Sequence, residues 1–476
     1  MLEQDIKKPN FSGCSQGTLL IYNVVIIFIF SMVMVAALSY ASTQLKLTAS
    51  TVARQQAFQI AEAGVNYYEW RLAHFPTDFW DGNASTTPGP YVHNYVDTDT
   101  NVKVGEYSLQ ITPPSVGSTI VTISSTGYTV DNPSNRRTVT VRYGIPSVAK
   151  FAFLTNSDVW IGSTENVNGE LHANGGIRFD GTGNAPITSS KTTYTCQTYH
   201  GCGPTTKPGV WGSAPASTQA FWQYPVPNTD FSTMTSDLAS IKSGAQSGGI
   251  YLPPSSARGY SLVFTSDGHV RIYKVTSLLS NPTGYDVNGN AQNRKTDYNG
   301  RTEQTSICNP SPCNIPANGL IYVEDQTWVE GTVKGRALVA AATLPYNANT
   351  APSILLPNNL VYLAKDGTNS LGLISQQDIL ATYRSPNNME VDAAMIAQNG
   401  SVQHYEWDGN IKTKITIYGS LASFGIWTWS WVDGGGNTIS GYQTTQTTYD
   451  ANLLFAPPPS FPLTSNGYVP ITWTSN

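Results

Sequence analysis

The feature that most constrains this chain is an uncharged apolar stretch near its N-terminus, which runs from Leu19 to Ala41. About 20 apolar residues suffice for a helix to cross the hydrocarbon core of a bilayer. The stretch therefore predicts a membrane-spanning helix. Lys7 and Lys8 precede it, and because positive charge favours the cytoplasmic side, we expect the N-terminus to lie in the cytoplasm.

Two other kinds of export signal fit this region less well. A secretory signal peptide has a shorter apolar core followed by a small-residue cleavage site, which Ala41-Ser-Thr imitates only weakly. A lipobox-like Phe11-Ser-Gly-Cys14 is present, but a lipobox follows its hydrophobic segment and this one precedes it.

The predicted helix continues beyond the membrane. No proline occurs from Thr18 to Phe75, and small or apolar residues recur at helical spacing through residues 42–73. These positions are Leu45, Ala49, Val52, Ala53, Ala57, Ile60, Ala61 and Gly64. A helix of about 55 residues would be about 80 Å long. Its first half is apolar on all sides, and its second half is amphipathic.

Two short motifs give this region a resemblance to a known family. The stretch Ser15-Gln-Gly-Thr-Leu-Leu-Ile-Tyr22 resembles a prepilin processing site, with a short polar leader before Gly17 and an apolar helix after it. The stretch Ala61-Glu62-Ala63-Gly64 resembles the AEAG segment in the long helix of PilX-type minor pilins. The resemblance to type IV pilins covers roughly residues 1–75.

The resemblance implies how the chain is processed and assembled. Prepilin peptidase would cut between Gly17 and Thr18, Cys14 would leave with the leader, and Thr18 would become the methylated N-terminus.

Most pilins carry Glu at the fifth mature position, where this chain has Tyr22. A carboxylate in an apolar phase is costly unless it is paired, and Tyr22 offers no such partner to another subunit's amine. We therefore expect a subunit at the filament tip, or one used sparingly.

The remaining cysteines form two close pairs, Cys196 with Cys202 and Cys308 with Cys313. On a chain with an export signal, such pairs predict two local disulfides. Free thiols in a cytosolic protein are one alternative. A zinc site using Cys196, His200 and Cys202 is another, but it lacks a fourth ligand and the usual spacing.

The rest of the chain is predicted to be mainly β. Only 12% of its residues are charged, and it has 26 Tyr and 11 Trp, a composition that suits an exported β-protein. Residues 76–100 are expected to form a loop. Three alternating segments follow, at 102–111, 118–124 and 137–143, and predict an antiparallel meander that packs on the helix as in pilins.

From about Lys150 to Gly425 the pattern changes to short strands separated by Gly and Asn, one of which is predicted from Val167 to His172. Such strands suit the stacked coils of a β-solenoid, although no fixed period is visible and a β-sandwich is the alternative. Two excursions, near 183–259 and 280–316, contain the cysteine pairs, and the first contains a predicted short helix, Asp230 to Ala245. An aromatic hairpin with Trp427, Trp429 and Trp431 on one face then precedes a Pro-rich tail. These Trp predict core packing, with a sugar-stacking stripe as the alternative.

No enzyme signature is present: the six His are scattered, and H-E-x-x-H, G-x-S-x-G and Walker patterns are absent. We therefore expect neither an enzyme nor a cofactor.

Asp286 to Asn290 begins like a calcium loop with Asp297 at its twelfth position, but the sixth position is Ala291 rather than Gly. A polysaccharide-active enzyme would need carboxylates that converge, for which the candidates are Asp378, Glu390 and Asp392.

The fold class expected is α+β, mainly β, with a long transmembrane and amphipathic helix, a pilin-like antiparallel sheet and a β-solenoid-like (β-helix) head. The expected regions are a cleaved leader at 1–17, the long helix at 18–75, the small sheet at 76–148, the head at 149–425, and the hairpin and tail at 426–476.

The function expected is that of a minor, tip-located subunit of a type IV pilus or related filament, whose extracellular head contributes adhesion or surface interaction. Its partners would be other pilin subunits and the assembly machinery, prepilin peptidase, the inner or cytoplasmic membrane before assembly, and a surface glycan or cell ligand. A net charge of −5 with no basic run argues against nucleic acid as a partner without excluding it. The alternative is a bitopic membrane-anchored surface binding protein that does not join a filament.

Overall fold

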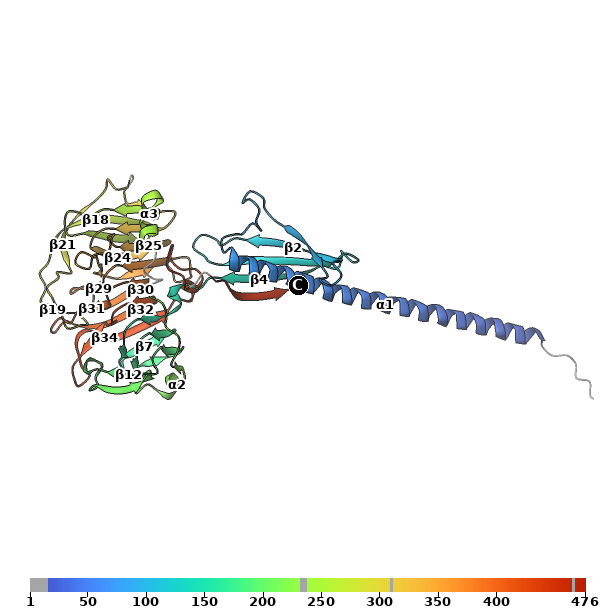
Figure 1. Cartoon of the computed structure of the whole chain (residues 1–476), viewed down its shortest axis with the longest axis horizontal. Coiled ribbons are helices and arrows are strands. Elements are labelled where there is room, and N and C mark those ends of the chain that lie inside the picture. Colours follow the sequence, from blue (N-terminus) through green and yellow to red (C-terminus); the bar gives the residue numbers. More distant parts are fainter. Residues whose placement is uncertain (1–15, 232–237, 309–310, 465–466) are drawn as a thin grey trace, which may run out of the picture.

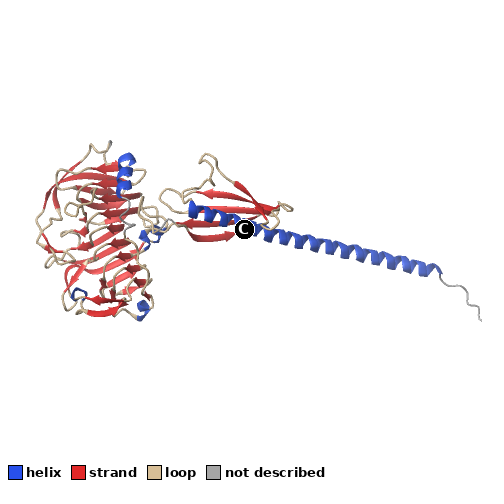
Figure 2. Cartoon of the chain, viewed as in Figure 1, coloured by secondary structure: helices blue, strands red, loops and turns tan. Residues whose placement is uncertain are grey.

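The computed structural model describes residues 16–231, 238–308, 311–464 and 467–476. It has three parts along its length: a bare helix, a helix-backed sheet and a large β-rich head (Figure 1). Strands dominate the head and the sheet, and the long helix forms the stem (Figure 2). A long N-terminal apolar helix followed by a mainly β structure is what the sequence predicted.

The long helix α1 spans Gln16–His74, 59 residues, which corresponds to about 90 Å. From Leu19 to Val52 almost every residue is exposed, whereas from Ala53 onward one face is buried. The helix ends two residues before Pro76, and Arg71 and His74 lie in its last turn, where positive charge complements the helix dipole.

A five-stranded antiparallel sheet packs against the second half of α1. Its order is β1 (Tyr91–Val96), β2 (Lys103–Thr112), β3 (Val121–Thr129), β4 (Arg137–Gly144) and β35 (Val469–Ser475). The three predicted strands are present as β2, β3 and β4. Residues 76–100 are not all loop as expected, because Tyr91–Val96 form β1. The end of the expected tail region, beyond the Pro-rich segment, is a strand, β35, which pairs with β4.

Small residues let the helix approach the sheet closely. A Cβ built on Gly127 of β3 would lie 2.3 Å from the Ala57 carbonyl oxygen and 2.4 Å from the Ala61 nitrogen. On the helix, a Cβ on Gly64 would lie 2.3 Å from Ser125 Oγ. Glycine is therefore required on both sides of this seam, which lies beside a core of buried Ile, Val, Leu and Tyr.

The head is an insertion between two neighbouring strands of this sheet, because β4 leads into it and β35 follows it. Arg336 fastens the junction: its Nη2 donates to the carbonyl oxygens of Gly117 at 2.8 Å, Ala456 at 2.8 Å and Pro457 at 2.6 Å. The head is thus joined to the sheet by two chain segments and by one half-buried guanidinium.

Within the head, short strands stack in parallel ladders. The longest is, in spatial order, β16 (Ile250–Leu252), β23 (Leu320–Val323), β25 (Arg336–Ala341), β28 (Ser370–Ser375), β30 (Asn388–Ala397), β32 (Ile411–Ser423), β5 (Phe153–Thr155), β8 (Leu171–Ala173), β11 (Ile187–Ser189) and β15 (Trp222–Gln223).

Three further parallel ladders run alongside. One is β17 (Tyr260–Thr265), β24 (Thr327–Val333), β26 (Ile354–Leu356), β29 (Ile379–Ala381) and β31 (Val402–His404). Another joins β24, β27 (Leu360–Tyr362), β30, β32, β34 (Thr438–Tyr449), β7 (Glu165–Asn168) and β10 (Thr182–Gly183). The last is β6 (Val159–Ile161), β9 (Ile177–Phe179) and β14 (Val210–Trp211).

The order of the ladders explains why no period was visible in the sequence. The chain enters the stack in the middle at β5 and proceeds outward to β15. It then crosses to the opposite end at β16 and returns inward to β32 and β34, beside its point of entry. Figure 1 shows this as green strands at one end, yellow-green strands at the other and orange strands between.

Antiparallel additions decorate the stack. They are β18 (His269–Leu278), β21 (Tyr298–Glu303) and β22 (Cys313–Asn314), the pairs β12 (Thr193–Cys196) with β13 (Thr205–Pro208) and β19 (Gly284–Tyr285) with β20 (Ala291–Gln292), and β33 (Ser430–Val432), which pairs with β34. The helices here are α2 (Ala216–Gln219) and α3 (Leu238–Gly248), with short 3-10 turns at Val148–Lys150, Thr198–His200 and Ala451–Leu454.

Three sequence predictions about the head need correction. The predicted helix Asp230 to Ala245 lies partly outside the described residues, and the described helix runs from Leu238 to Gly248. The single strand predicted from Val167 to His172 is two strands, β7 and β8. The hairpin at 426–449 is not separate from the head, because β34 pairs in parallel with β32 and β7.

Candidate functional site

The first candidate surface is the bare part of α1. It is the one helix among the described residues that is long and apolar enough to cross a membrane, with a mean hydropathy of 2.7 in its most apolar window, none of which is buried. Tyr22 lies in this part and is 67% exposed. Gly17 and Thr18 lie in the first turn of α1, and residues 1–15 of the expected leader lie outside the described residues.

The AEAG segment lies where the helix meets the sheet. Ala61 and Gly64 are buried, and Glu62 and Ala63 are half-buried at the margin. The motif therefore has a packing role in this structure, because Ala61 and Gly64 face the seam with β3.

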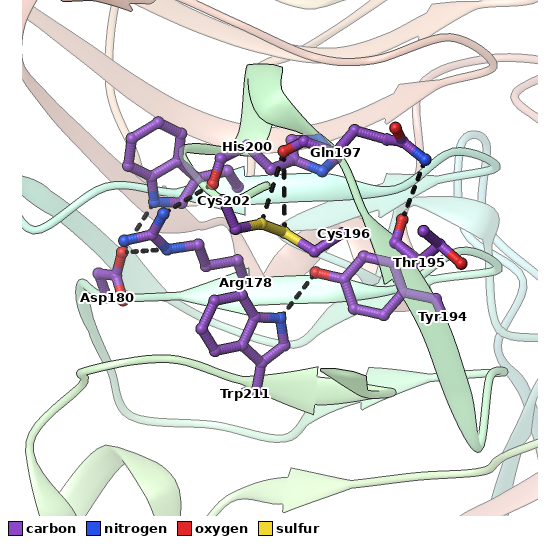
Figure 3. Close-up of a disulfide and its surroundings, with 10 residues drawn as sticks. Arg178, Asp180, Tyr194, Thr195, Cys196, Gln197, His200, Cys202 and Trp211 are labelled. Atoms are coloured by element: carbon purple, nitrogen blue, oxygen red, sulfur yellow. Dashed lines mark hydrogen bonds and ion pairs between the residues drawn. A yellow bond between two sulfur atoms is a disulfide. The ribbon is translucent and has the colours of Figure 1, made fainter. Parts of the chain in front are cut away.

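Both cysteine pairs form disulfides, Cys196–Cys202 and Cys308–Cys313. The first closes the loop after β12 and holds it beside a row of aromatic residues (Figure 3). Because the sulfurs are bonded to each other, the alternative zinc site at Cys196, His200 and Cys202 loses two of its ligands.

The calcium-like segment has a different structure from a calcium loop. Asp286 Oδ1 accepts from the backbone nitrogens of Asn288 and Asn290, both at 2.9 Å, in a tight turn. Asp297 instead accepts from Thr296 and pairs with Arg384. The two carboxylates are thus engaged separately, and no cluster of three or more metal-ligating side chains occurs among the described residues.

The three carboxylates considered for catalysis divide into two groups. Asp378 is held by Ser401 N at 2.9 Å and lies 3.9 Å from Arg294, and burial raises its pKa. Glu390 and Asp392 share Lys365 instead, at 2.7 and 2.9 Å. Since Asp378 has no partner in common with the other two, the described contacts give no convergent catalytic set.

A cleft in the head brings together residues that the sequence scatters. Its floor is formed by Trp160 of β6 and Arg178 of β9, which are paired in register, while Trp211 of β14 is paired with Arg178 on the other side and does not line the cavity. The guanidinium lies 4.4 Å from the Trp160 ring centre and 5.4 Å from that of Trp211. Asp180 binds Arg178 Nε and accepts from Trp160 Nε1, both at 2.8 Å (Figure 3).

The opposite wall of the cleft is the aromatic hairpin. Trp427 and Trp429 are buried, as the core interpretation predicted, and the Trp427 ring lies 4.5 Å from that of Phe153. Trp431 is only half-buried, and its Nε1 donates to the His404 carbonyl oxygen at 2.7 Å. All three rings line the cleft, but Trp427 and Trp429 are buried in the core, whereas Trp431 keeps part of its surface exposed.

The space between the two walls consists of two adjoining cavities of about 540 and 350 Å³. Glu165 lines the smaller cavity, and burial raises its pKa to about 8, so it is largely protonated at neutral pH. His200 lines the larger one, and burial lowers its pKa to about 4, so it is neutral.

Sequence reasoning missed this cleft. Arg178 and Trp211 are more than thirty positions apart in the sequence. Only the parallel register of the strands aligns them with each other and with Trp160. The half-exposed Trp431 was visible as the third member of the stripe, but nothing in the sequence set it apart from Trp427 and Trp429.

No protein-family model matches the chain, and no curated protein matches it. Among solved structures, it is similar to the crystal structure of the competence-associated pilin ComZ from Thermus thermophilus, with 13% sequence identity. The similarity covers 89% of this chain and 97% of that chain at a TM-score of 0.29.

Proposed function

We propose that this chain is a minor pilin of the PilX type, placed at or near the tip of a type IV pilus-like filament, with a head that serves adhesion. Before assembly it would be a single-pass membrane protein with a cytoplasmic N-terminus. After assembly α1 would lie among the helices of other pilin subunits in the filament core, and the head would be extracellular.

The observation that carries this proposal is the division of α1. Residues 19–52 are bare over about 50 Å, and residues 19–41 of this stretch are uncharged and mostly apolar. A surface of this kind in water would be a large aggregation-prone patch, so it needs a bilayer or other apolar helices around it. The second half of the same helix is packed on an antiparallel sheet, which holds the bare half out as a stem.

Three further features support the finer parts of the proposal. Gly17 and Thr18 at the start of the helix suit cleavage by prepilin peptidase and methylation of the new N-terminus. Tyr22 supplies no carboxylate for the next subunit's amine, which suits a terminal or sparse position. The inserted head is bulky beside the sheet, which suits a filament end better than a thin shaft (Figure 1).

We further propose that the head is a β-solenoid. The support is that its strands stack in several parallel ladders with side chains in register, from β16 at one end to β15 at the other. The disulfides suit an oxidising compartment, and the separately engaged carboxylates give no reason to propose an enzyme.

The experiment is to shear filaments from cells and quantify this chain in the filament fraction, with immunogold labelling to locate it. We expect a low ratio to the major subunit and label at filament ends. The variant Tyr22→Glu should raise the filament content, and Tyr22→Phe serves as its matched control. A chain that stays wholly in the membrane fraction would instead support the bitopic surface binding protein.

A further inference from the structure

We propose that the cleft between the Trp160–Arg178 row and the Trp431 hairpin binds an uncharged pyranose sugar of a surface glycan. The proposal rests on the proposed adhesive role for its biological meaning. It is tested separately from that role, because sugar binding is measured without a filament.

The size and walls of the cleft fit one or two sugar rings. The larger cavity measures about 540 Å³, within the range of small-ligand sites. Trp160 and Trp431 are half-buried and Tyr199 is 60% exposed, so all three offer ring surface to the cavity that they line. Flat aromatic faces suit the C–H faces of pyranoses, with polar groups at their edges.

An unpartnered polar group points to a missing ligand. His200 is 3% exposed and lines the cavity, yet neither ring nitrogen has a hydrogen-bond partner among the described residues. A buried polar group without a partner is costly. A neutral imidazole presents one donor and one acceptor on different sides of its ring, so two sugar hydroxyls, one accepting and one donating, would satisfy it.

The charges in the cleft favour an uncharged ligand. Arg178 is the one cation among the described residues that line the two cavities, and it is already bound to Asp180 at 2.8 Å and to the His200 carbonyl oxygen at 2.7 Å. A nucleic acid or acidic glycan would need free cations here. The hydroxyl of Ser430, which lines both cavities, suits neutral hydroxyl groups instead.

The site is rigid before any ligand arrives. Arg178 is stacked between two indoles, and Trp211 Nε1 donates to Tyr194 at 2.8 Å (Figure 3). The Cys196–Cys202 disulfide ties the loop that carries Tyr199 and His200. Preorganisation of this kind reduces the entropy lost on binding.

The test is saturation-transfer NMR on the full-length protein in lipid nanodiscs, without glycoside detergents. The probes are the methyl glycosides of glucose, galactose, mannose and N-acetylglucosamine at about 10 mM. N-acetylneuraminic acid and a single-stranded DNA oligonucleotide are tested alongside. We expect at least one neutral glycoside to bind.

Two cleft variants and one control locate the binding. Trp431→Ala and Tyr199→Ala should each weaken it by about tenfold, and Tyr199→Ala guards against misfolding because that side chain is largely exposed. Trp473→Ala, at an exposed tryptophan of β35 in the sheet, should leave binding unchanged. The proposal is overturned if no neutral glycoside binds, if only the acidic sugar or DNA binds, or if both cleft variants bind like the wild type. Filament incorporation of these variants tests the pilin role independently.

Discussion

A single methyl group at position 127 should loosen the helix from its sheet. In Gly127→Ala the new Cβ would lie 2.3 Å from the Ala57 carbonyl oxygen, whereas real Cβ contacts essentially never fall below 3.0 Å. The helix must therefore retreat by roughly 0.7 Å, because the atoms it meets are backbone and cannot rotate away.

The expected cost follows from two opposing terms. Overpacking of a well-packed core costs about 1–3 kcal/mol, and replacing Gly by Ala within a strand returns about 0.5–1 kcal/mol. The net loss is about 1.5 kcal/mol, which is about a tenfold change in an opening equilibrium. We expect this loss of stability to be confined to α1 and the sheet, since the ladders of the head do not contact the seam.

Hydrogen exchange of the full-length protein in nanodiscs measures this effect by segment. Residues 56–72 of α1 should exchange about tenfold faster in Gly127→Ala, with the head unchanged. Gly434→Ala is the matched control, because no atom lies within 4 Å of its added Cβ. Unaltered exchange of residues 56–72 in Gly127→Ala would refute the reasoning about the seam.

Three further predictions concern the head. Ionisation of Glu165 opposes folding, because its pKa is about 8 when folded and about 4.3 when unfolded. The stability of the protein should therefore fall as the pH rises from about 5 to about 8. In thermal unfolding at these two pH values, the stability of Glu165→Gln should fall less than that of the wild type. Arg336→Ala leaves four carbonyl oxygens without their charged donor and should cost about 3 kcal/mol at the junction. Small-angle scattering should show a wider range of head orientations, and an unchanged profile would contradict this. Replacing both Cys196 and Cys202 by Ser opens a short loop worth about 2 kcal/mol, and limited proteolysis should then cut within residues 197–203, with the corresponding Cys308 and Cys313 double variant as the control that leaves this segment intact.

The sequence was sufficient for elements whose signal is local. The uncharged run after Thr18 gave the helix, alternation gave β2, β3 and β4, and close cysteine pairing gave both disulfides. β35 carried the same alternation, in Val469 to Ser475, but its partner β4 lies more than three hundred positions earlier.

Long-range order was beyond the sequence for a physical reason. Parallel ladders pair residues by register across coils of unequal length, and here the chain also enters the stack in its middle. The row of Trp160, Arg178 and Trp211 exists only once that register is set. The same holds for the burial of Trp427 and Trp429 beside a half-exposed Trp431.

The central claim is that α1 is a pilin helix, and the most direct measurement is the intact mass and N-terminal sequence of the protein from cells with and without prepilin peptidase. The account predicts a mature chain that begins at a methylated Thr18 and is found only when the peptidase is present. A chain that retains Met1 in both strains, or one cut near Ala41 or at Cys14, would contradict it.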